Sequence, residues 1–332
     1  QSRQEPAPER ACASVSGASI SEKSRGWSTI ETSPLTGWRW PKAVCRASTL
    51  SGAIVSSRSS RATNPSIGWP VSQSRSPLIH GYWLKQFDIK GDYGRVAVEP
   101  ERAEDFFAHF ADSGLVGGNV TIPYKETAAR AARHREPVVE RIGAANTLWL
   151  EDGVLCAGNT DGIGFLANLD DRAPGWDKAP GEALVLGAGG AAAAVVDALV
   201  ERGFRVCIVN RTLSRAEALA ARYPGRAFAD VLSAANRYAV TAGFLVNTTS
   251  LGMKGDGAID LDLSVLSADV VVTDIVYVPL QTPFLASAVS RGLRTVDGLG
   301  MLLHQAVPGF TRWFGQRPSV TAELRALIEA DL

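Results

Sequence analysis

A glycine turn between an apolar strand and a helix constrains the fold of this chain more than any other feature. The turn is Gly187-Ala188-Gly189-Gly190-Ala191, which follows the apolar run 183–186 and opens a helical run that ends at Arg202. In such a unit, backbone N–H groups at the helix N-terminus can bind a pyrophosphate. The sequence therefore predicts a dinucleotide site at residues 187–191.

A second apolar run, 206–209, ends at Asn210-Arg211-Thr212. Proteins that bind NAD usually carry an Asp or Glu at this place, where the carboxylate holds the ribose 2′-OH, whereas a cation suits the 2′-phosphate of NADP. The position of Arg211 therefore predicts NADP as the cofactor.

Length and composition are those of an ordinary soluble protein of two domains. The 332 residues are 45% hydrophobic and 20% charged, and the chain is long enough for two sizeable cores. A formal net charge of zero gives no indication of a nucleic-acid partner, and we find no apolar run long enough to predict a membrane span. Because Cys12, Cys45, Cys156 and Cys207 show neither CxxC spacing nor a disulfide pattern, we expect a cytoplasmic location.

Residues 1–62 differ in composition from the remainder. They contain 14 Ser, and nine Lys and Arg against four Asp and Glu. An Arg- and Ser-rich, acid-poor leader is typical of an organellar transit peptide, but Trp27, Trp38, Trp40 and the scattered acids suit neither a transit peptide nor a folded unit. We expect this segment to be a disordered or artefactual leader outside the folded domains.

Strand and helix patterns alternate from Pro65 onward, which predicts an α/β fold with parallel strands and right-handed crossovers. We expect Ser76 to cap a helix that has Pro77 at its first position, an amphipathic helix at 101–113, and a hairpin around Asp152-Gly153. The strands expected in the second half are 183–186, 205–209, 244–247, 270–274 and 294–297.

Several strings of residues resemble shikimate dehydrogenase in their type, order and spacing. The resemblance covers about residues 66–332, and the strings are 68–77 (GWPVSQSRSP), 119–126 (NVTIPYKE), 145–147 (ANT), 158–162 (GNTDG), 187–191 (GAGGA), 210–212 (NRT), 247–253 (NTTSLGM), 274–277 (DIVY) and 297–306 (DGLGMLLHQA).

This resemblance implies reversible, NADPH-dependent reduction of 3-dehydroshikimate to shikimate, in the pathway that supplies aromatic amino acids. It also implies two domains, with the active site in the cleft between them and a monomer or homodimer as the assembly. The expected substrate domain spans residues 66–162 and is completed by 300–332, and the expected Rossmann-like NADP-binding domain spans 163–299.

The resemblance also implies roles for individual residues. The matched catalytic pair is Lys125 and Asp161. The positions matching the substrate site are Ser74, Ser76, Thr121, Asn146, Tyr277 and Gln305. Those matching the cofactor site are Gly187, Ala188, Gly189, Gly190, Ala191, Asn210, Arg211, Thr212, Arg215, Ile275, Gly298 and Met301.

These residue types suit the chemistry. Reduction of a ketone by hydride leaves charge on oxygen, which needs a nearby proton donor. The Lys125 ammonium can donate that proton, and the Asp161 carboxylate can orient it.

Structural alternatives stay open: Asp161 as a helix cap, Arg215 as a surface residue, and Asn146 and Gln305 as buried amides that hold loops. His80 and His304 have no metal-ligand spacing, so we expect structural roles and no metal.

Two rival functions follow from the same sequence. A quinate/shikimate dehydrogenase that uses NAD is disfavoured by Arg211 and Thr212, and a non-catalytic metabolite sensor is disfavoured by the presence of both Lys125 and Asp161. The chain also departs from the family pattern. Gln73 replaces a common His, Ala192 ends the glycine motif, and the segment where the first strand is expected is polar and contains Pro65, which should interrupt a central strand.

Overall fold

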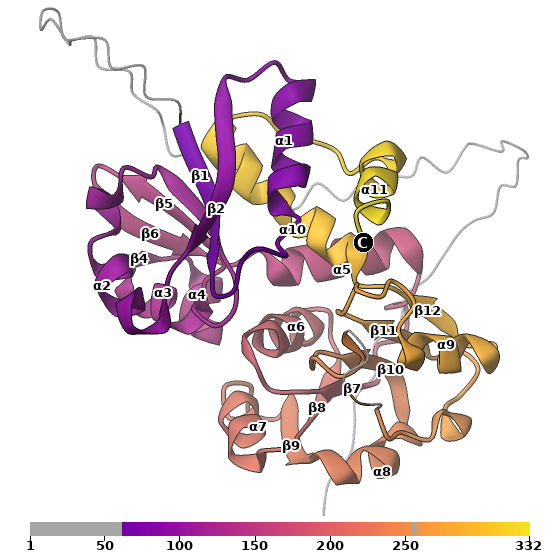
Figure 1. The fold of residues 1–332 in the computed structure, drawn as a ribbon. Helices are drawn as coiled ribbons and strands as arrows, with labels where there is room; N and C mark the ends of the chain where they lie inside the picture. The colour runs from indigo at the N-terminus through magenta and orange to yellow at the C-terminus, as the bar shows by residue number, and fades with distance from the viewer. Residues whose placement is uncertain (1–61, 254–256, 258) are drawn as a thin grey trace, which may run out of the picture. The chain divides into compact units, whose positions relative to one another are not determined.

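The computed structural model describes residues 62–253, 257 and 259–332. The described residues belong to one compact unit that contains two six-stranded sheets flanked by helices (Figure 1). We call the first sheet with its helices the substrate lobe and the second the dinucleotide lobe. The expected α/β class is confirmed. The leader expected at 1–62 lies outside the described residues, except that Ala62 is the first residue of strand β1.

The substrate lobe is built on a mixed sheet with the strand order β2-β1-β3-β5-β6-β4. Its strands are β1 (Ala62–Gly68), β2 (Gly91–Ala97), β3 (Gly117–Val120), β4 (His134–Arg135), β5 (Thr147–Glu151) and β6 (Val154–Gly158). The expected hairpin is present, since β5 and β6 are antiparallel and their turn has positive φ at both Asp152 and Gly153.

Each face of this sheet is covered by its own helices. One apolar core lies under α2 (Ala103–Ala108), α3 (Lys125–Ala131) and α4 (Pro137–Ile142). The other lies under α1 (Ser76–Gln86), α10 (Leu299–Phe314) and α11 (Ala322–Glu329). Helices α10 and α11 therefore pack against the same sheet as α1.

Strand β1 corrects the expectation that Pro65 interrupts the first strand. This strand is central and runs parallel to both β2 and β3. The Val116 N–H donates to the Thr63 carbonyl, while the Val116 carbonyl accepts from Leu150 of β5. Proline has no N–H to donate to the sheet. The neighbouring carbonyl on the β3 side is that of Val116, and it accepts its hydrogen bond from β5 instead. The N–H that Pro65 lacks would lie at the point where the pairing of β1 with β3 begins. The strand therefore tolerates the proline.

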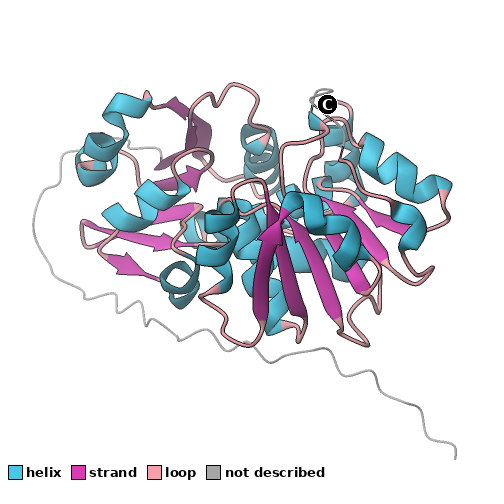
Figure 2. Ribbon diagram, turned by 90° about the horizontal axis from the view of Figure 1, so that it is seen from below, coloured by secondary structure: helices cyan, strands magenta, loops and turns pink. Residues whose placement is uncertain are grey.

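The dinucleotide lobe is built on a parallel sheet with the order β12-β11-β10-β7-β8-β9. Its strands are β7 (Glu182–Leu186), β8 (Arg205–Asn210), β9 (Ala227–Val231), β10 (Ala242–Asn247), β11 (Val271–Asp274) and β12 (Arg294–Val296). Counted from β7, this is the doubly wound order 3-2-1-4-5-6 that binds dinucleotides where the strand order reverses. Figure 2 shows these strands between their flanking helices.

The strands of this sheet are buried on both faces. Val185 and neighbouring side chains face the core under α5 (Asp161–Arg172), α6 (Gly190–Glu201) and α7 (Leu213–Ala220). The alternate side chains, such as Leu184, face the core under α8 (Ala235–Ala239) and α9 (Pro283–Ser290). The five strands expected here are present. Strand β9 was not predicted, because it is a half-buried edge strand and its sequence has no apolar run.

Two local predictions were wrong. Segment 101–113 is not one helix, because the chain leaves α-helical geometry at His109, whose ring Nδ1 lies 3.0 Å from the Asp105 carbonyl oxygen. Ser76 is not the cap of α1 but its first residue, and Arg75 occupies the cap position without a side-chain hydrogen bond.

Within the described ranges, no helix is both long and apolar enough to cross a bilayer.

Candidate active site

The side chains of Lys125 and Asp161 form an ion pair at the carboxyl end of the first sheet. Lys125 is the first residue of α3 and follows β3, whereas Asp161 is the first residue of α5 and follows β6. The Lys125 Nζ donates to Asp161 Oδ2 over 2.5 Å, and both side chains are largely buried, with exposed fractions of 15% and 7%. The carboxylate is used for this pair, and α5 has no side-chain cap hydrogen bond, so the capping alternative for Asp161 is not what the structure shows.

Asn146 holds the carboxylate of this pair. Its Nδ2 donates to Asp161 Oδ1 over 2.8 Å, and its Oδ1 accepts from the Thr160 N–H over 2.9 Å. The Asp161 N–H in turn donates to Asn159 Oδ1. Because Asn146 is itself buried, these contacts fix one orientation of the carboxylate. Asn159 and Thr160 were part of the family motif but were not assigned a role from the sequence.

The residues expected around the substrate come from several elements. Ser74 and Ser76 follow β1, and Thr121 follows β3. Ser74 Oγ donates to Ser66 Oγ over 3.1 Å. Gln305 on α10 accepts from Asn146 Nδ2 through its Oε1, over 3.3 Å, which brings it to the ion pair.

Tyr277 comes from the other lobe, on the loop after β11. Its side chain is half-buried, and this burial raises the pKa of the phenol, with Arg75 of the substrate lobe acting in the opposite direction. The neighbourhood of Tyr277 thus includes a charge from the segment that carries Ser74 and Ser76. The structure therefore brings these parts of the two lobes near each other.

The glycine turn after β7 has the geometry of a phosphate cradle. Gly187 has a φ of 110°, and a Cβ there would come within 2.7 Å of Thr248 Oγ1. Helix α6 begins at Gly190, where a Cβ would lie 3.7 Å from Lys125 Cδ. The free N-terminus of α6 therefore opens beside the catalytic candidate of the other lobe. Ala188 and Ala191 are half-buried parts of the same turn, and Gly189 is exposed.

The end of β8 presents cations to solvent. Arg211 and Arg215 are exposed, and in the described part of the chain neither forms an ion pair. Asn210 Nδ2 donates to the Thr212 carbonyl over 2.8 Å, which holds the turn between β8 and α7. Cations in this place are available for an anionic group.

The turns after β11 and β12 carry the remaining residues that the sequence predicts for the cofactor site. A Cβ on Gly298 would collide with the carbonyl of Ile275, so the backbones of these two turns lie close together at this point. Met301 is buried in the first turn of α10. Sequence reasoning missed Asp274, a fully buried carboxylate that accepts from Asn247 Nδ2, the Val276 N–H and Thr282 Oγ1 over 2.8–3.0 Å. It shapes the loop that carries Ile275 and Tyr277.

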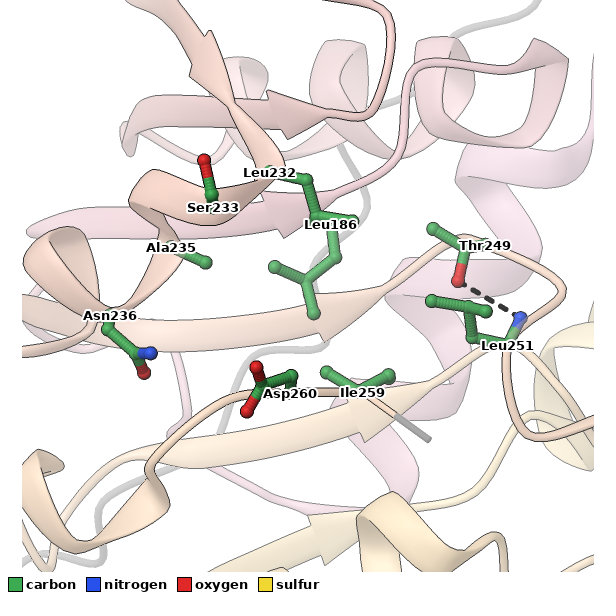
Figure 3. A pocket seen from close by; sticks show the side chains of 9 residues that line it. All are labelled: Leu186, Leu232, Ser233, Ala235, Asn236, Thr249, Leu251, Ile259 and Asp260. Atoms are coloured by element: carbon green, nitrogen blue, oxygen red, sulfur yellow. Dashed lines mark hydrogen bonds between the residues drawn. The ribbon is translucent and has the colours of Figure 1, made fainter. Parts of the chain in front are cut away.

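A cavity of about 310 Å³ lies near the carboxyl end of β7 (Figure 3). It is lined by Leu186, Leu232, Ser233, Ala235, Asn236, Thr249, Leu251, Ile259 and Asp260. Thr249 Oγ1 accepts from the Leu251 N–H over 3.1 Å, so the loop after β10 is shaped by its own side chain. The string 247–253 was the signal for this loop, although no residue in it was assigned from the sequence.

Two histidines, His80 and His304, lie in buried or half-buried surroundings. His80 is fully buried and stacks on Tyr93 with ring centroids 3.9 Å apart, and its burial lowers the pKa of the imidazole to about 3. Burial also lowers the pKa of His304. Among the described residues there is no cluster of three or more His, Cys, Asp or Glu that could hold a metal.

Comparison with known proteins gives a consistent result. Three family models match: the shikimate dehydrogenase substrate binding domain over residues 67–148, shikimate/quinate 5-dehydrogenase over 176–252, and the shikimate 5′-dehydrogenase C-terminal domain over 298–328. An NADP⁺ shikimate dehydrogenase of Azorhizobium caulinodans is 60% identical over 266 residues, which are 80% of this chain and 95% of that protein.

Solved structures resemble this one in the same way. A shikimate 5-dehydrogenase of Thermus thermophilus, in complex with NADP(H) and shikimate, matches with a TM-score of 0.72 and 34% identity, covering 81% of this chain and 99% of that one. A quinate dehydrogenase of Corynebacterium glutamicum in complex with NAD matches with a TM-score of 0.73 and 26% identity, over 81% and 99%. The fold alone therefore does not separate the two substrates.

Asp274 makes the stability of the protein depend on pH. Burial raises the pKa of its carboxyl to about 6, above the ordinary value of about 3.9 in the unfolded chain. The neutral acid is therefore favoured by folding, so this contribution is complete below about pH 4 and is lost as the pH rises through about 6. From pH 4 to 7, the unfolding free energy of the wild type should fall by roughly 2–3 kcal/mol relative to Asp274→Asn.

Urea denaturation of both proteins at several pH values measures this difference. Asp269→Asn, which changes an exposed carboxylate in the same lobe, is the matched control. Parallel stability curves for the wild type and Asp274→Asn would contradict the prediction.

Proposed function

The chain belongs to the shikimate dehydrogenase family, and from this premise we propose that it reduces 3-dehydroshikimate to shikimate, reversibly and with NADPH. One observation carries the proposal. The Lys125–Asp161 ion pair of one lobe lies beside the first turn of α6 in the other, where a Cβ on Gly190 would be 3.7 Å from Lys125 Cδ. A proton donor and a dinucleotide cradle thus meet at one place.

Lys125 is the group that we assign to proton transfer. Bound NADPH supplies the hydride, and the ketone oxygen gains negative charge as its carbon is reduced. The Lys125 ammonium stabilises that charge and gives its proton to the oxygen. In the reverse direction the same nitrogen accepts the hydroxyl proton. Asp161 keeps the ammonium in one orientation, because Asn146 and the Asn159 side chain fix the carboxylate and its backbone.

The polyhydroxy acid substrate is assigned to the polar side chains around this pair. Ser74, Ser76 and Thr121 supply hydroxyl groups from the substrate lobe, and Tyr277 supplies one from the loop after β11. Asn146 and Gln305 supply amides. Asn146 is the more constrained of the two, since its amide already holds Asp161, so any contact it makes with substrate adds to an orienting role.

The cofactor is assigned to the dinucleotide lobe. The turn at Gly187 has no room for a Cβ, which suits close approach of a pyrophosphate to backbone. Arg211 and Arg215 are cations without ion pairs among the described residues, which suits a 2′-phosphate. The backbone contact between Gly298 and Ile275, with Met301 beside it, supports a nicotinamide site. The adenine end is assigned to the cavity of Figure 3, which is lined by Leu186 at the end of β7 and by Leu232 and Ser233 directly after β9.

Location, assembly and domain boundaries complete the proposal. Free, buried Cys156 and Cys207 support the cytoplasm as the location, because disulfides are rare there. A monomer or homodimer, and the absence of a nucleic-acid partner, stay as predictions from sequence. The boundaries of the two domains, 66–162 with 300–332 and 163–299, are proposed on the same footing, with α5 and α10 as the two helices that connect the sheets.

An assay of both substrates with both cofactors tests the proposed function. We expect the highest kcat/KM for shikimate with NADP⁺, because Arg211 favours the 2′-phosphate. The alternative activity is quinate oxidation with NAD⁺, because the structure also resembles a quinate dehydrogenase. Faster turnover of quinate with NAD⁺ would favour the rival, and no turnover of any pair would favour a metabolite sensor.

Removal of the proposed proton donor should slow the reaction selectively. Lys125→Ala should lower kcat by about 10²–10⁴, with a smaller change in the KM for shikimate. Asp161→Asn should also lose rate, and because the two residues act as a unit, the double variant should be scarcely slower than the slower single variant. Steady-state oxidation of shikimate, after circular dichroism has shown folding, measures this. Near-normal kcat in Lys125→Ala would remove that residue from the mechanism.

Removal of the cation after β8 should change cofactor choice. A hydrogen bond to a charged group contributes roughly 1.5–3 kcal/mol, so Arg211→Ala should weaken NADPH binding by about 10- to 150-fold and leave NADH binding nearly unchanged. Dissociation constants from nicotinamide fluorescence measure both. Arg205→Gln, which removes a partly exposed cation elsewhere in β8, is the control, and an equal loss for both cofactors in Arg211→Ala would contradict the assignment.

A further inference from the structure

An ion pair with a buried carboxylate connects the two lobes at the middle of α6: the Asp197 side chain is 5% exposed, and that of Arg141 is 42% exposed. Arg141 belongs to α4 of the substrate lobe, and Asp197 belongs to α6 of the dinucleotide lobe. Arg141 Nε donates to Asp197 Oδ1 over 2.9 Å, and Arg141 Nη2 donates to Oδ2 over 2.8 Å. A guanidinium that meets a carboxylate with two parallel hydrogen bonds fixes direction as well as distance.

The partners of this pair are themselves held in place. Asp197 is only 4% exposed, and its Oδ1 accepts a third hydrogen bond from the Tyr223 hydroxyl over 3.0 Å. Arg141 Nη2 also donates to Glu201 Oε1 on the same helix α6. In the opposite direction, Arg222 Nη1 of the dinucleotide lobe donates to the Arg141 carbonyl. Each lobe therefore contributes donors to the other at this contact.

Helix α6 transmits the position of this contact to the active site. Gly190, in its first turn, faces Lys125, and Asp197 lies seven residues later. At 1.5 Å per residue the two points are roughly 10 Å apart on one helix. The substrate lobe makes the same connection from its side, because α4 leads directly to Ala145, whose N–H donates to the Lys125 carbonyl over 2.8 Å.

We infer that Arg141 and Asp197 are positioning residues for the reduction: by fixing α6 against α4, they set the distance between Lys125 and the cofactor turn at Gly190. The inference rests on the proposed function. Neither side chain lies at the reacting atoms, so the pair acts only through α6 and the 142–146 segment. Since each cofactor candidate after β7 and β8 lies wholly within the dinucleotide lobe, affinity for NADPH does not depend on the pair.

Two variants separate positioning from folding. Arg141→Lys keeps the charge but loses the two-pronged contact. The double variant Arg141→Met with Asp197→Leu replaces the pair, whose carboxylate is buried, with apolar side chains, and such an exchange at a buried pair often leaves folding stability intact. Both should lower kcat by roughly 10²-fold, the cost of a small misplacement, while the NADPH dissociation constant stays at its wild-type value. The primary isotope effect from deuterated NADPH on kcat should rise, because hydride transfer becomes limiting.

The matched control is Arg205→Gln, which breaks the Arg205–Glu182 ion pair between β8 and β7 within one lobe and should leave kcat unchanged. If either folded variant keeps wild-type kcat, or loses NADPH affinity as much as kcat, the inference is overturned.

A readout without turnover keeps the inference apart from the proposed function. Spin labels at Lys85→Cys on α1 and Ser214→Cys on α7, both exposed, report the distance between the lobes by pulsed electron resonance when Cys12 and Cys45 are replaced by Ser. The double variant should broaden the distribution relative to wild type and Arg205→Gln. An unchanged distribution overturns the inference, whereas an inactive wild type overturns only the proposed function.

Discussion

The candidate site depends on the ion pair between Lys125 and Asp161, which lies where the two lobes meet. A lysine ammonium in water is a mobile charge on a flexible stem, but here its Nζ is held by a carboxylate that is buried and fixed by Asn146. Two strands and two helix N-termini are needed to bring these groups together, because Lys125 follows β3 and Asp161 follows β6. The antiparallel β5 between those strands carries Asn146 to the same edge.

The second sheet brings the cofactor side to that edge by the same rule. In a parallel sheet the turns at the carboxyl ends lie together, and the strand order reverses at β7, so the glycine turn opens where a dinucleotide can cross. Backbone contacts, such as that between Gly298 and Ile275, keep the turns close. The proposed proton donor and the proposed cofactor turn thus lie on different lobes, and α6 reaches the substrate lobe twice, with its first residue near Lys125 and its middle paired with Arg141.

Sequence reasoning succeeded where the signal is local. The glycine turn, the strand that ends just before Arg211 and the hairpin at Asp152-Gly153 all depend on neighbours in the chain, and each was predicted. It failed where the local structure depends on residues that are distant in the sequence but close in space. Pro65 was expected to interrupt a strand, yet Val116 turns its carbonyl to β5 and removes the need for the missing donor. Asp197 gave no signal, because nothing in the sequence of α6 indicates that a partner 56 residues away will bury and pair its carboxylate.

The most direct measurement is the crystal structure of this protein with NADP⁺ and shikimate bound together. Lys125 Nζ should lie about 2.6–3.2 Å from the hydroxyl oxygen that becomes the ketone, Asp161 should still accept from the same nitrogen, and the nicotinamide ring should face the carbon bearing that oxygen. A complex in which Lys125 points away from this oxygen, with another side chain in its place, would contradict the account.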